Sequence, residues 1–189
     1  MPFSFEDHTF EKADFAPAGL PAKEFINCIF NGCNFAGTDL TGADFFDCMF
    51  NSCNLGLVKL KGTGLKNVQF TGCKITGVDF TLANNFLFSV GFTDSVLDYS
   101  AFQKKKMKKT VFRNTSMKET HFSGNDLSES VFDNCDLTAA LFQDNNLEKA
   151  DFRTAQNYFI SPNQNKLKKA RFSLHGLPGL LSEWDLVVE

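Results

Sequence analysis

Large apolar residues occupy every fifth position over most of this chain. The first series runs from Phe5 to Phe80, and each of its sixteen positions holds Phe, Leu or Ile. A period of five fits neither an α-helix, which repeats every 3.6 residues, nor a β-strand, which repeats every two. These side chains therefore enter the core from a backbone that turns at regular intervals, and the pattern predicts a solenoid.

A second series continues the rhythm in a shifted phase. It runs from Leu87 to Phe152, and Phe alternates in it with Leu or Met. In the first series, Leu20, Leu40 and Leu60 recur at intervals of twenty residues. Together, the alternation and this recurrence indicate a coil with four five-residue sides. Residues twenty positions apart are then expected to stack on the same wall.

The residue two positions before each apolar centre is nearly always small, which suits a side chain that points inward at a corner. With the Asp or Asn that often follows, it forms units such as Ala-Asp-Phe-Phe-Asp at residues 43–47 and Ala-Asp-Phe-Arg-Thr at residues 150–154. These units resemble the A(D/N)LXX repeat of the pentapeptide-repeat family over nearly the whole chain. The resemblance implies an all-β fold, a right-handed quadrilateral β-helix with the centre and small residues stacked inside.

Two irregularities interrupt the repeat within an expected single domain of residues 1–189. The step from Phe80 to Leu87 is seven residues instead of five, which predicts two stacks at about residues 3–82 and 86–172. Residues 161–165 read as a loop before Leu167 and Phe172 resume the pattern. We expect such bulges to contact other molecules.

The repeat ends after Phe172, and residues 173–189 are predicted to cap the open end of the solenoid. Residues 176–184 predict a short helix with Pro178 in its first turn, and residues 185–189 predict a final strand. In similar members of the family, including the Qnr and MfpA groups, a C-terminal helix joins two rods. The resemblance therefore implies a homodimer interface at Leu177, Leu180, Leu181 and Trp184.

The chain begins without a basic segment followed by an apolar stretch, and its sequence holds no apolar run of the length that crosses a membrane. With 43% hydrophobic and 22% charged residues, it has enough apolar side chains for one large core. We therefore expect a cytoplasmic protein without membrane contact.

Six cysteines raise the question of a metal site or disulfides, since Cys28 and Cys33, like Cys48 and Cys53, are five residues apart. All six lie two positions before a centre, where Cys acts as a compact hydrophobe. Stacked Cβ atoms point in parallel rather than toward each other, and a straight column cannot supply a tetrahedral zinc shell. The pattern predicts reduced core thiols, with no metal and no cofactor.

The sequence holds no recognisable catalytic group of residues. His8, His121 and His175 are isolated, and winding in twenty-residue coils keeps His8 several coils from His121. The glycines fall between centres, which is typical of tight corners rather than of a phosphate-binding loop. We therefore expect no enzymatic activity.

The basic run at residues 104–109 resembles a nucleic-acid-binding patch at first sight. Stacking at intervals of twenty instead brings mostly opposite charges together. This favours exposed ion-pair ladders, each pair worth about 0–1 kcal/mol, over a nucleic-acid surface. The expected columns are Lys109 with Glu129, Lys149 and Lys169, Arg113 with Asp133 and Arg153, and Lys106 with Asp126.

Lys105 is an exception, because it falls in an inward position that otherwise holds a small residue. We expect either that the wall bulges there or that the lysine stem reaches back to water.

The first half of the chain carries an acidic wall next to outward apolar residues. Glu24 and Asp44 stack like on like in adjacent coils. Exposed apolar residues beside stacked acids predict a partner-binding patch, although scattered surface hydrophobes are the alternative. The candidate residues are Glu24, Asp44, Asp47, Ile26, Phe46, Ile29 and Met49.

Two functions are compatible with these patterns. The repeat favours a non-catalytic protein-interaction or scaffold rod, because folding needs only the inward positions. The resemblance to the Qnr and MfpA groups implies the alternative, a DNA-mimicking regulator that binds DNA gyrase, a type II topoisomerase, and protects it from quinolones or other gyrase poisons. The net charge of −3 is low for such a mimic. Neither function requires direct nucleic-acid binding by this chain.

Overall fold

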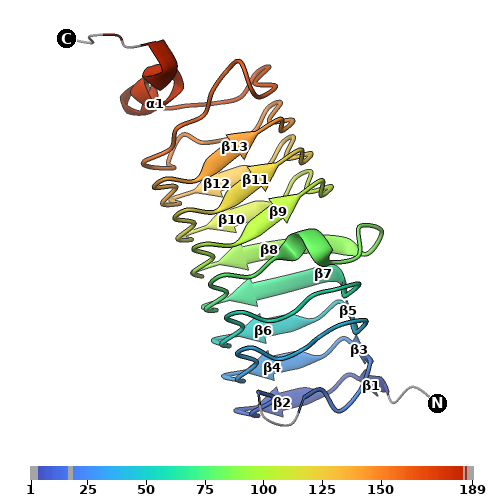
Figure 1. Cartoon of the computed structure of the whole chain (residues 1–189). Coiled ribbons are helices and arrows are strands. Elements are labelled where there is room, and N and C mark those ends of the chain that lie inside the picture. The colour runs from blue at the N-terminus through green and yellow to red at the C-terminus, as the bar shows by residue number, and fades with distance from the viewer. Residues whose placement is uncertain (1–3, 17–18, 185, 187–189) are drawn as a thin grey trace.

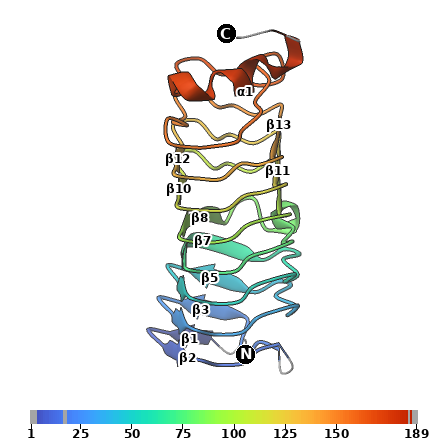
Figure 2. The same ribbon diagram turned by 90° about the vertical axis from the view of Figure 1, so that its left-hand side faces the viewer.

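A computed structural model describes residues 4–16, 19–184 and 186, and it shows a four-sided rod of stacked coils (Figure 1). The fold is a right-handed quadrilateral β-helix, as predicted. Figure 2 shows β1 (Ser4–Glu6) near one end of the rod and α1 (Pro178–Leu181) across the other. The walls are built from short parallel strands, one above the other.

Strands of the first half lie on two adjacent walls. The first wall carries β1, β3 (Glu24–Ile26) and β5 (Asp44–Phe46), and the second carries β2 (Thr9–Glu11), β4 (Ile29–Asn31) and β6 (Met49–Asn51). The longer strand β7 (Gly64–Thr71) spans both walls.

Strands of the second half lie on the second and fourth walls. The second wall continues through β8 (Phe88–Thr93), β10 (Val111–Arg113) and β12 (Val131–Asp133), and the fourth wall carries β9 (Ala101–Gln103), β11 (His121–Ser123) and β13 (Leu141–Gln143). Isolated parallel bridges complete the remaining sides.

The register between coils is twenty residues, which confirms the predicted winding. Phe25 pairs with Phe45 on the first wall, and their rings stack with centroids 5.0 Å apart and planes 7° from parallel. Near the other end, Phe132 and Phe152 stack at 4.4 Å. These columns of parallel rings form a continuous apolar core along the rod.

Most corners lie two residues after a centre and have a left-handed backbone. Gly32 and Gly62 have φ values of +61° and +69°, so these glycines serve as tight corners, as predicted. Asn27 and Asp47, with φ of 51° and 53°, occupy equivalent corners, because their short polar side chains tolerate this conformation.

Inward small residues also satisfy backbone carbonyls that face the core. The Sγ of Cys53 donates to the carbonyl oxygen of Phe30 at 3.2 Å, and the Oγ1 of Thr63 donates to that of Leu40 at 2.7 Å. Both bonds reach back 23 residues. A carbonyl left without a donor inside the rod would be costly, so these positions favour small side chains that carry a donor.

All six cysteines occupy such inward positions and are buried as free thiols. Burial raises the pKa of the Cys48 and Cys135 thiols to about 12. Both side chains are therefore protonated near neutral pH, the state in which a thiol is a poor nucleophile and a poor metal ligand.

The slip of phase lies in the loop after the 3₁₀ helix η1 (Phe80–Leu82). Leu65 pairs with Phe88, which is 23 residues further along the chain, and the register shifts again before Val68. Phe88 is buried whereas Leu87 is only half-buried, so Leu87 is not the centre that the periodicity predicted. Extra residues push the chain outward here, and the next inward position passes to Phe88.

Backbone hydrogen bonds join the coils on both sides of this loop through the other walls. The backbone N–H of Gly72 donates to Thr93 at 2.9 Å, and that of Ala101 donates to Val78 at 3.0 Å. The division of one domain into two stacks stays a prediction.

Lys105 lies inside the rod and is 1% exposed, so the prediction that its stem reaches water is wrong. Its Nζ donates to the carbonyl of Ala83 at 2.6 Å and to the Oδ1 of Asn85, and it lies 5.0 Å from the ring centroid of Phe88. Burial lowers the pKa of Lys105, and the Asp79 carboxylate opposes this effect.

This ammonium group replaces a missing backbone connection. In the described part of the chain, no backbone hydrogen bond joins residues 83–88 to residues 105–108. The wall does bulge, but in the coil before Lys105, and the lysine holds the bulged loop to the next coil.

Three buried asparagines continue the column of Lys105. Its backbone N–H donates to the Oδ1 of Asn125 at 2.8 Å, and Asn125 donates in the same way to Asn145 at 2.9 Å. Asn145 repeats the contact with Asn165 at 3.1 Å. Each amide therefore has partners within the core, as buried polar groups require.

The C-terminal cap contains η2 (Leu174–Gly176), α1 and η3 (Ser182–Trp184), which confirms the predicted short helix. Leu180 packs against the core, and the carbonyl of Gly179 accepts from Ile160 at 3.0 Å. Of the strand predicted at residues 185–189, only Leu186 is described, and it belongs to no strand. Within the described ranges, no helix is long and apolar enough to cross a bilayer.

Replacing Lys105 by Met tests the role of its ammonium group. We expect Lys105→Met to lower the free energy of unfolding by about 1–3 kcal/mol, because Ala83 and Asn85 lose their donor inside the rod. Urea unfolding followed by circular dichroism measures this loss. Lys104→Met, a change at the exposed neighbouring lysine, is the control and should leave the midpoint nearly unchanged. Equal midpoints for the two variants would contradict the role assigned to Lys105.

Candidate partner-binding surface

The acidic and apolar candidate residues come together on the first two walls. Parallel pairing of β3 with β5 places Glu24 opposite Asp44 and Ile26 opposite Phe46. Pairing of β4 with β6 places Ile29 opposite Met49 on the next wall. Asp47 follows β5 and stands at the corner between the walls. We refer to these residues as the N-terminal patch: Glu24, Ile26, Ile29, Asp44, Phe46, Asp47 and Met49.

The apolar members of the N-terminal patch lie on the outside of the rod. Met49 is 46% exposed, and Ile26, Ile29 and Phe46 are half-buried. The Nζ of Lys66 lies 6.0 Å from the ring centroid of Phe46 and marks the edge of the patch. The patch can therefore contribute apolar contact area without rearrangement of the core.

Its acids carry charge that the rod does not neutralise. Glu24 and Asp44 are direct cross-strand neighbours, an arrangement that is destabilising for like charges. Asp47 accepts a hydrogen bond from the Nδ2 of Asn67 at 2.7 Å. Among the described residues, every ion pair lies between Lys108 and Arg171, outside the patch. Residues 4–54 carry eight acids against two lysines, so this end of the rod is negative.

The predicted ion-pair ladders are present in part. Lys109 contacts Glu129 at 3.8 Å, and Arg113 contacts Asp133 at 3.1 Å, which confirms one rung in each of two columns. Glu129 has a closer partner in Lys108, at 3.1 Å. Lys108, directly after the centre Met107, and Lys109, two residues after it, can thus reach the same carboxylate.

Two other predicted rungs do not form as ion pairs between coils. Arg153 pairs with Asp151 at 2.7 Å on its own side of the coil rather than with Asp133. Lys106 forms a backbone bridge with Asp126, but the described side chains make no ion pair there within 4.0 Å. Long flexible side chains select the nearest carboxylate, which need not be one coil away.

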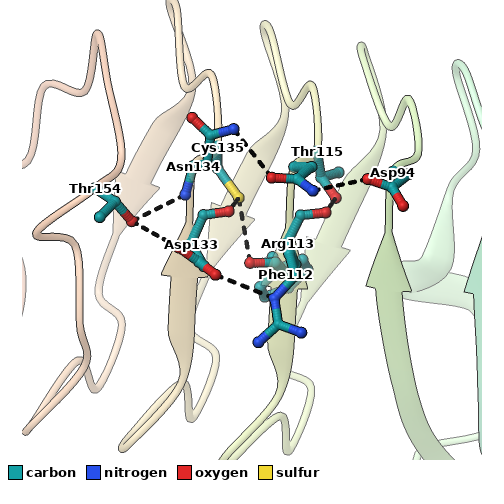
Figure 3. Close-up of polar contacts among 9 residues, drawn as sticks. Asp94, Phe112, Arg113, Thr115, Asp133, Asn134, Cys135 and Thr154 are labelled. Carbon is teal, nitrogen blue, oxygen red and sulfur yellow. Dashed lines mark hydrogen bonds and ion pairs between the residues drawn. The ribbon is translucent and has the colours of Figure 1, made fainter.

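A corner of the second half carries a hydrogen-bonded ladder built mainly on asparagine amides. The Nδ2 of Asn114 donates to Asp94 at 2.8 Å, and the Nδ2 of Asn134 donates to Asn114 at 3.0 Å. Figure 3 shows how Thr154 completes this ladder, with its Oγ1 accepting from the backbone N–H of Asn134 at 2.9 Å and donating to Asp133 at 3.1 Å. Amides carry both donor and acceptor, so they stack without the repulsion found between Glu24 and Asp44.

Phe86 is an exposed aromatic residue that the periodicity does not identify. Phe86 is 93% exposed in the loop between η1 and β8, and Leu82 is 54% exposed. The loop lies on the first wall, because the backbone N–H of Leu65 donates to Leu87 at 2.7 Å. Its position in the interrupted repeat was the only signal in the sequence that could have identified Phe86 as a surface residue.

The predicted dimer residues differ in their placement. Leu177 and Trp184 are 42% and 44% exposed, and Leu181 is half-buried. Leu180 packs against the core of its own chain. Exposed Leu174 extends the apolar surface at this end.

A groove of ≈ 720 Å³ lies between the last coil and the cap, with Arg153, Tyr158 and His175 in its lining. Arg153 is held there by Asp151. Within the described ranges, no group of three or more His, Cys, Asp or Glu side chains could hold a metal ion.

Two models of pentapeptide-repeat families match this chain. The family described as "Pentapeptide repeat region" matches residues 3–80 and 23–102, and "Pentapeptide repeats (8 copies)" matches residues 106–144 and 122–155. None of the curated proteins compared matches this chain.

Two solved structures are similar in architecture. HetL, a pentapeptide repeat protein involved in heterocyst differentiation regulation from the cyanobacterium Nostoc sp. strain PCC 7120, is 15% identical with a TM-score of 0.52, over 93% of this chain and 86% of its own. A trypsin-treated form of QnrB1, a plasmid-mediated fluoroquinolone resistance protein, is 17% identical with a TM-score of 0.48, over 100% of both chains. At these identities the likeness concerns the fold alone.

Proposed function

The chain belongs to the pentapeptide-repeat family, and from this premise we propose that it is a non-catalytic interaction rod that binds a protein partner through the N-terminal patch. One observation carries the proposal: Glu24 and Asp44 stand opposite each other, without an ion-pair partner among the described residues, beside the exposed Met49 and half-buried apolar side chains. The family alone does not specify a function, because function depends on the outward residues.

The charge and shape of the patch define the partner. A basic surface would relieve the repulsion between Glu24 and Asp44, and apolar partner groups would cover Phe46 and Met49. We therefore propose a protein partner with lysines or arginines around an apolar centre. We also propose a cytoplasmic location, where the six buried thiols would stay reduced, and a function without a cofactor.

Charge reversal in the patch tests this function. Affinity capture from a lysate of the source organism, quantified by mass spectrometry, would compare the native chain with the double variant Glu24→Lys, Asp44→Lys. We expect partners of the native chain to fall about tenfold in yield with this variant, because attraction becomes repulsion. Glu119→Lys with Asp144→Lys makes the same charge change at two exposed corners outside the patch and should retain them. Identical capture by all three proteins would rule out the patch as the binding surface.

A DNA-mimicking function is the second candidate, favoured by the excess of eight acids over two lysines in residues 4–54. In this function the partner is DNA gyrase, and the stacked carboxylates stand in for phosphates. QnrB1, similar in fold, is described as a fluoroquinolone resistance protein.

A gyrase supercoiling assay tests the mimic. With a fluoroquinolone present, we expect the native chain at micromolar concentration to restore supercoiling, and the triple variant Glu24→Lys, Asp44→Lys, Asp47→Lys to have no effect. The assay without the drug would show whether the chain itself inhibits the enzyme. If the native chain has no effect in either assay, the mimic is excluded and the interaction rod remains.

We further propose that the cap joins two copies of the chain through Leu177, Leu181 and Trp184. Leu180 is half-buried against the core of its own chain, so it offers less free surface to this interface than Leu177 or Trp184. Light scattering after size-exclusion chromatography should give a dimer mass for the native chain and a monomer mass for Leu177→Ser with Trp184→Ser, since these changes remove exposed apolar area. A native chain that is monomeric at high concentration would contradict the proposal.

A further inference from the structure

A second charged surface, opposite in sign to the N-terminal patch, lies on the first wall in the C-terminal half. Parallel bridges link Lys106 to Asp126, Asp126 to Asn146, and Asn146 to Lys166, so these residues form one column. Residues 104–109, 126–129, 146–149 and 166–169 together hold eight exposed lysines against three acids. We refer to these lysines as the basic wall: Lys104, Lys106, Lys108, Lys109, Lys149, Lys166, Lys168 and Lys169.

The acids between these lysines neutralise only part of the positive charge of the basic wall. Asp126 accepts from the backbone N–H of Ser128 and the Nδ2 of Asn146, both at 3.1 Å. Glu129 pairs with Lys108 and Lys109. These acids and Glu148 are half-buried, whereas the lysines are exposed. Among the described residues, six lysines of the wall make no ion pair within 4.0 Å: Lys104, Lys106, Lys149, Lys166, Lys168 and Lys169.

The exposed ring of Phe86 lies beside the basic wall. Phe86 is 93% exposed, and its loop is fastened to the next coil by the Nζ of Lys105, which bonds to Ala83 and Asn85. Lys106 follows directly in that coil. An almost fully exposed phenylalanine lowers solubility unless a partner covers it. The contacts of Lys105 hold the loop of Phe86 next to the lysines.

We propose that the basic wall and Phe86 bind a short acidic segment of a partner protein, with one apolar side chain on Phe86 and carboxylates on the lysines. Lys106 and Lys166 are three coils apart, roughly 14 Å at ~4.8 Å per coil, which four or five extended residues span. This surface is separate from the N-terminal patch and does not rest on the function proposed for it.

The occupant is a peptide rather than a nucleic-acid duplex for two reasons. A duplex offers phosphates to the lysines but no apolar group to Phe86. A long polyanion lying along the rod would also reach the negative coils of residues 4–54, where it would be repelled. A rod with both surfaces can hold two partners of opposite charge on one wall.

Fluorescence anisotropy with a fluorescein-labelled synthetic peptide tests the site on the full chain. The probe carries one Phe followed by a run of Glu, and the same peptide with Lys in place of Glu is its control. We expect the acidic probe to bind and the basic one not to bind, with affinity falling as NaCl rises, because the contacts are exposed ion pairs. Lys106→Glu with Lys108→Glu should weaken binding by about tenfold, and Phe86→Ser by about threefold.

Matched variants separate this site from general charge effects. Lys59 and Lys61 flank Leu60 on another wall, as Lys106 and Lys108 flank Met107, and both are exposed. Lys59→Glu with Lys61→Glu should therefore leave binding of the acidic probe unchanged.

Two further variants complete the set. Glu24→Lys with Asp44→Lys should also bind the acidic probe like the native chain, which distinguishes this site from the N-terminal patch. If circular dichroism shows that the glutamate variants fail to fold, Lys106→Gln with Lys108→Gln gives the same comparison with a smaller loss.

Three results would overturn the proposal. The first is an equal loss of binding in the Lys59, Lys61 control, which would indicate net charge alone. The second is tighter binding of a short DNA duplex than of the acidic peptide, which would assign the wall to phosphates. The third is a native dimer that dissociates with Lys106→Glu, Lys108→Glu in light scattering, which would assign the wall to a second copy of the chain.

Discussion

Each coil of this rod has to repeat the register of the coil before it. Parallel hydrogen bonds connect residues about twenty apart, and the same register stacks Phe25 on Phe45 and lets Cys53 reach the carbonyl of Phe30. A shift of one residue would turn the ring columns outward and leave inward carbonyls without donors. The whole structure depends on this coupling of backbone register to side-chain burial.

Because this constraint acts on inward residues, the residue types at outward positions are free to vary. The charges at these outward positions are distributed unequally along the rod. Glu24 and Asp44 face each other near one end, while Lys106 and Lys166 stand on the same wall in the C-terminal half. Because strands stack in register, a charge repeated every twenty residues becomes a continuous column on the surface. A rigid wall with separate negative and positive regions is suited to holding partners at a set distance.

The loop after η1 shows how the register survives an insertion. Phe88 takes the inward position next to Leu65, and the Lys105 ammonium replaces the backbone connection that the loop interrupts. As a result, the cationic side chain of Lys105 occupies a core position, and the loop carries Phe86 exposed on the surface. This irregular coil thus brings both an internal polar contact and a solvent-facing aromatic ring to the first wall.

By itself, the sequence determined the period, the four-sided coil and the inward placement of the cysteines, because burial in a regular repeat depends only on position. Only the tertiary structure decided that Lys105 turns inward, that Phe88 replaces Leu87, that Arg153 pairs with Asp151 rather than Asp133, and that Leu180 covers the core while Leu177 stays exposed. Each of these outcomes depends on the direction of a long side chain or on the path of an irregular segment. Neighbouring coils and the cap set both, and a five-residue period carries no information about either.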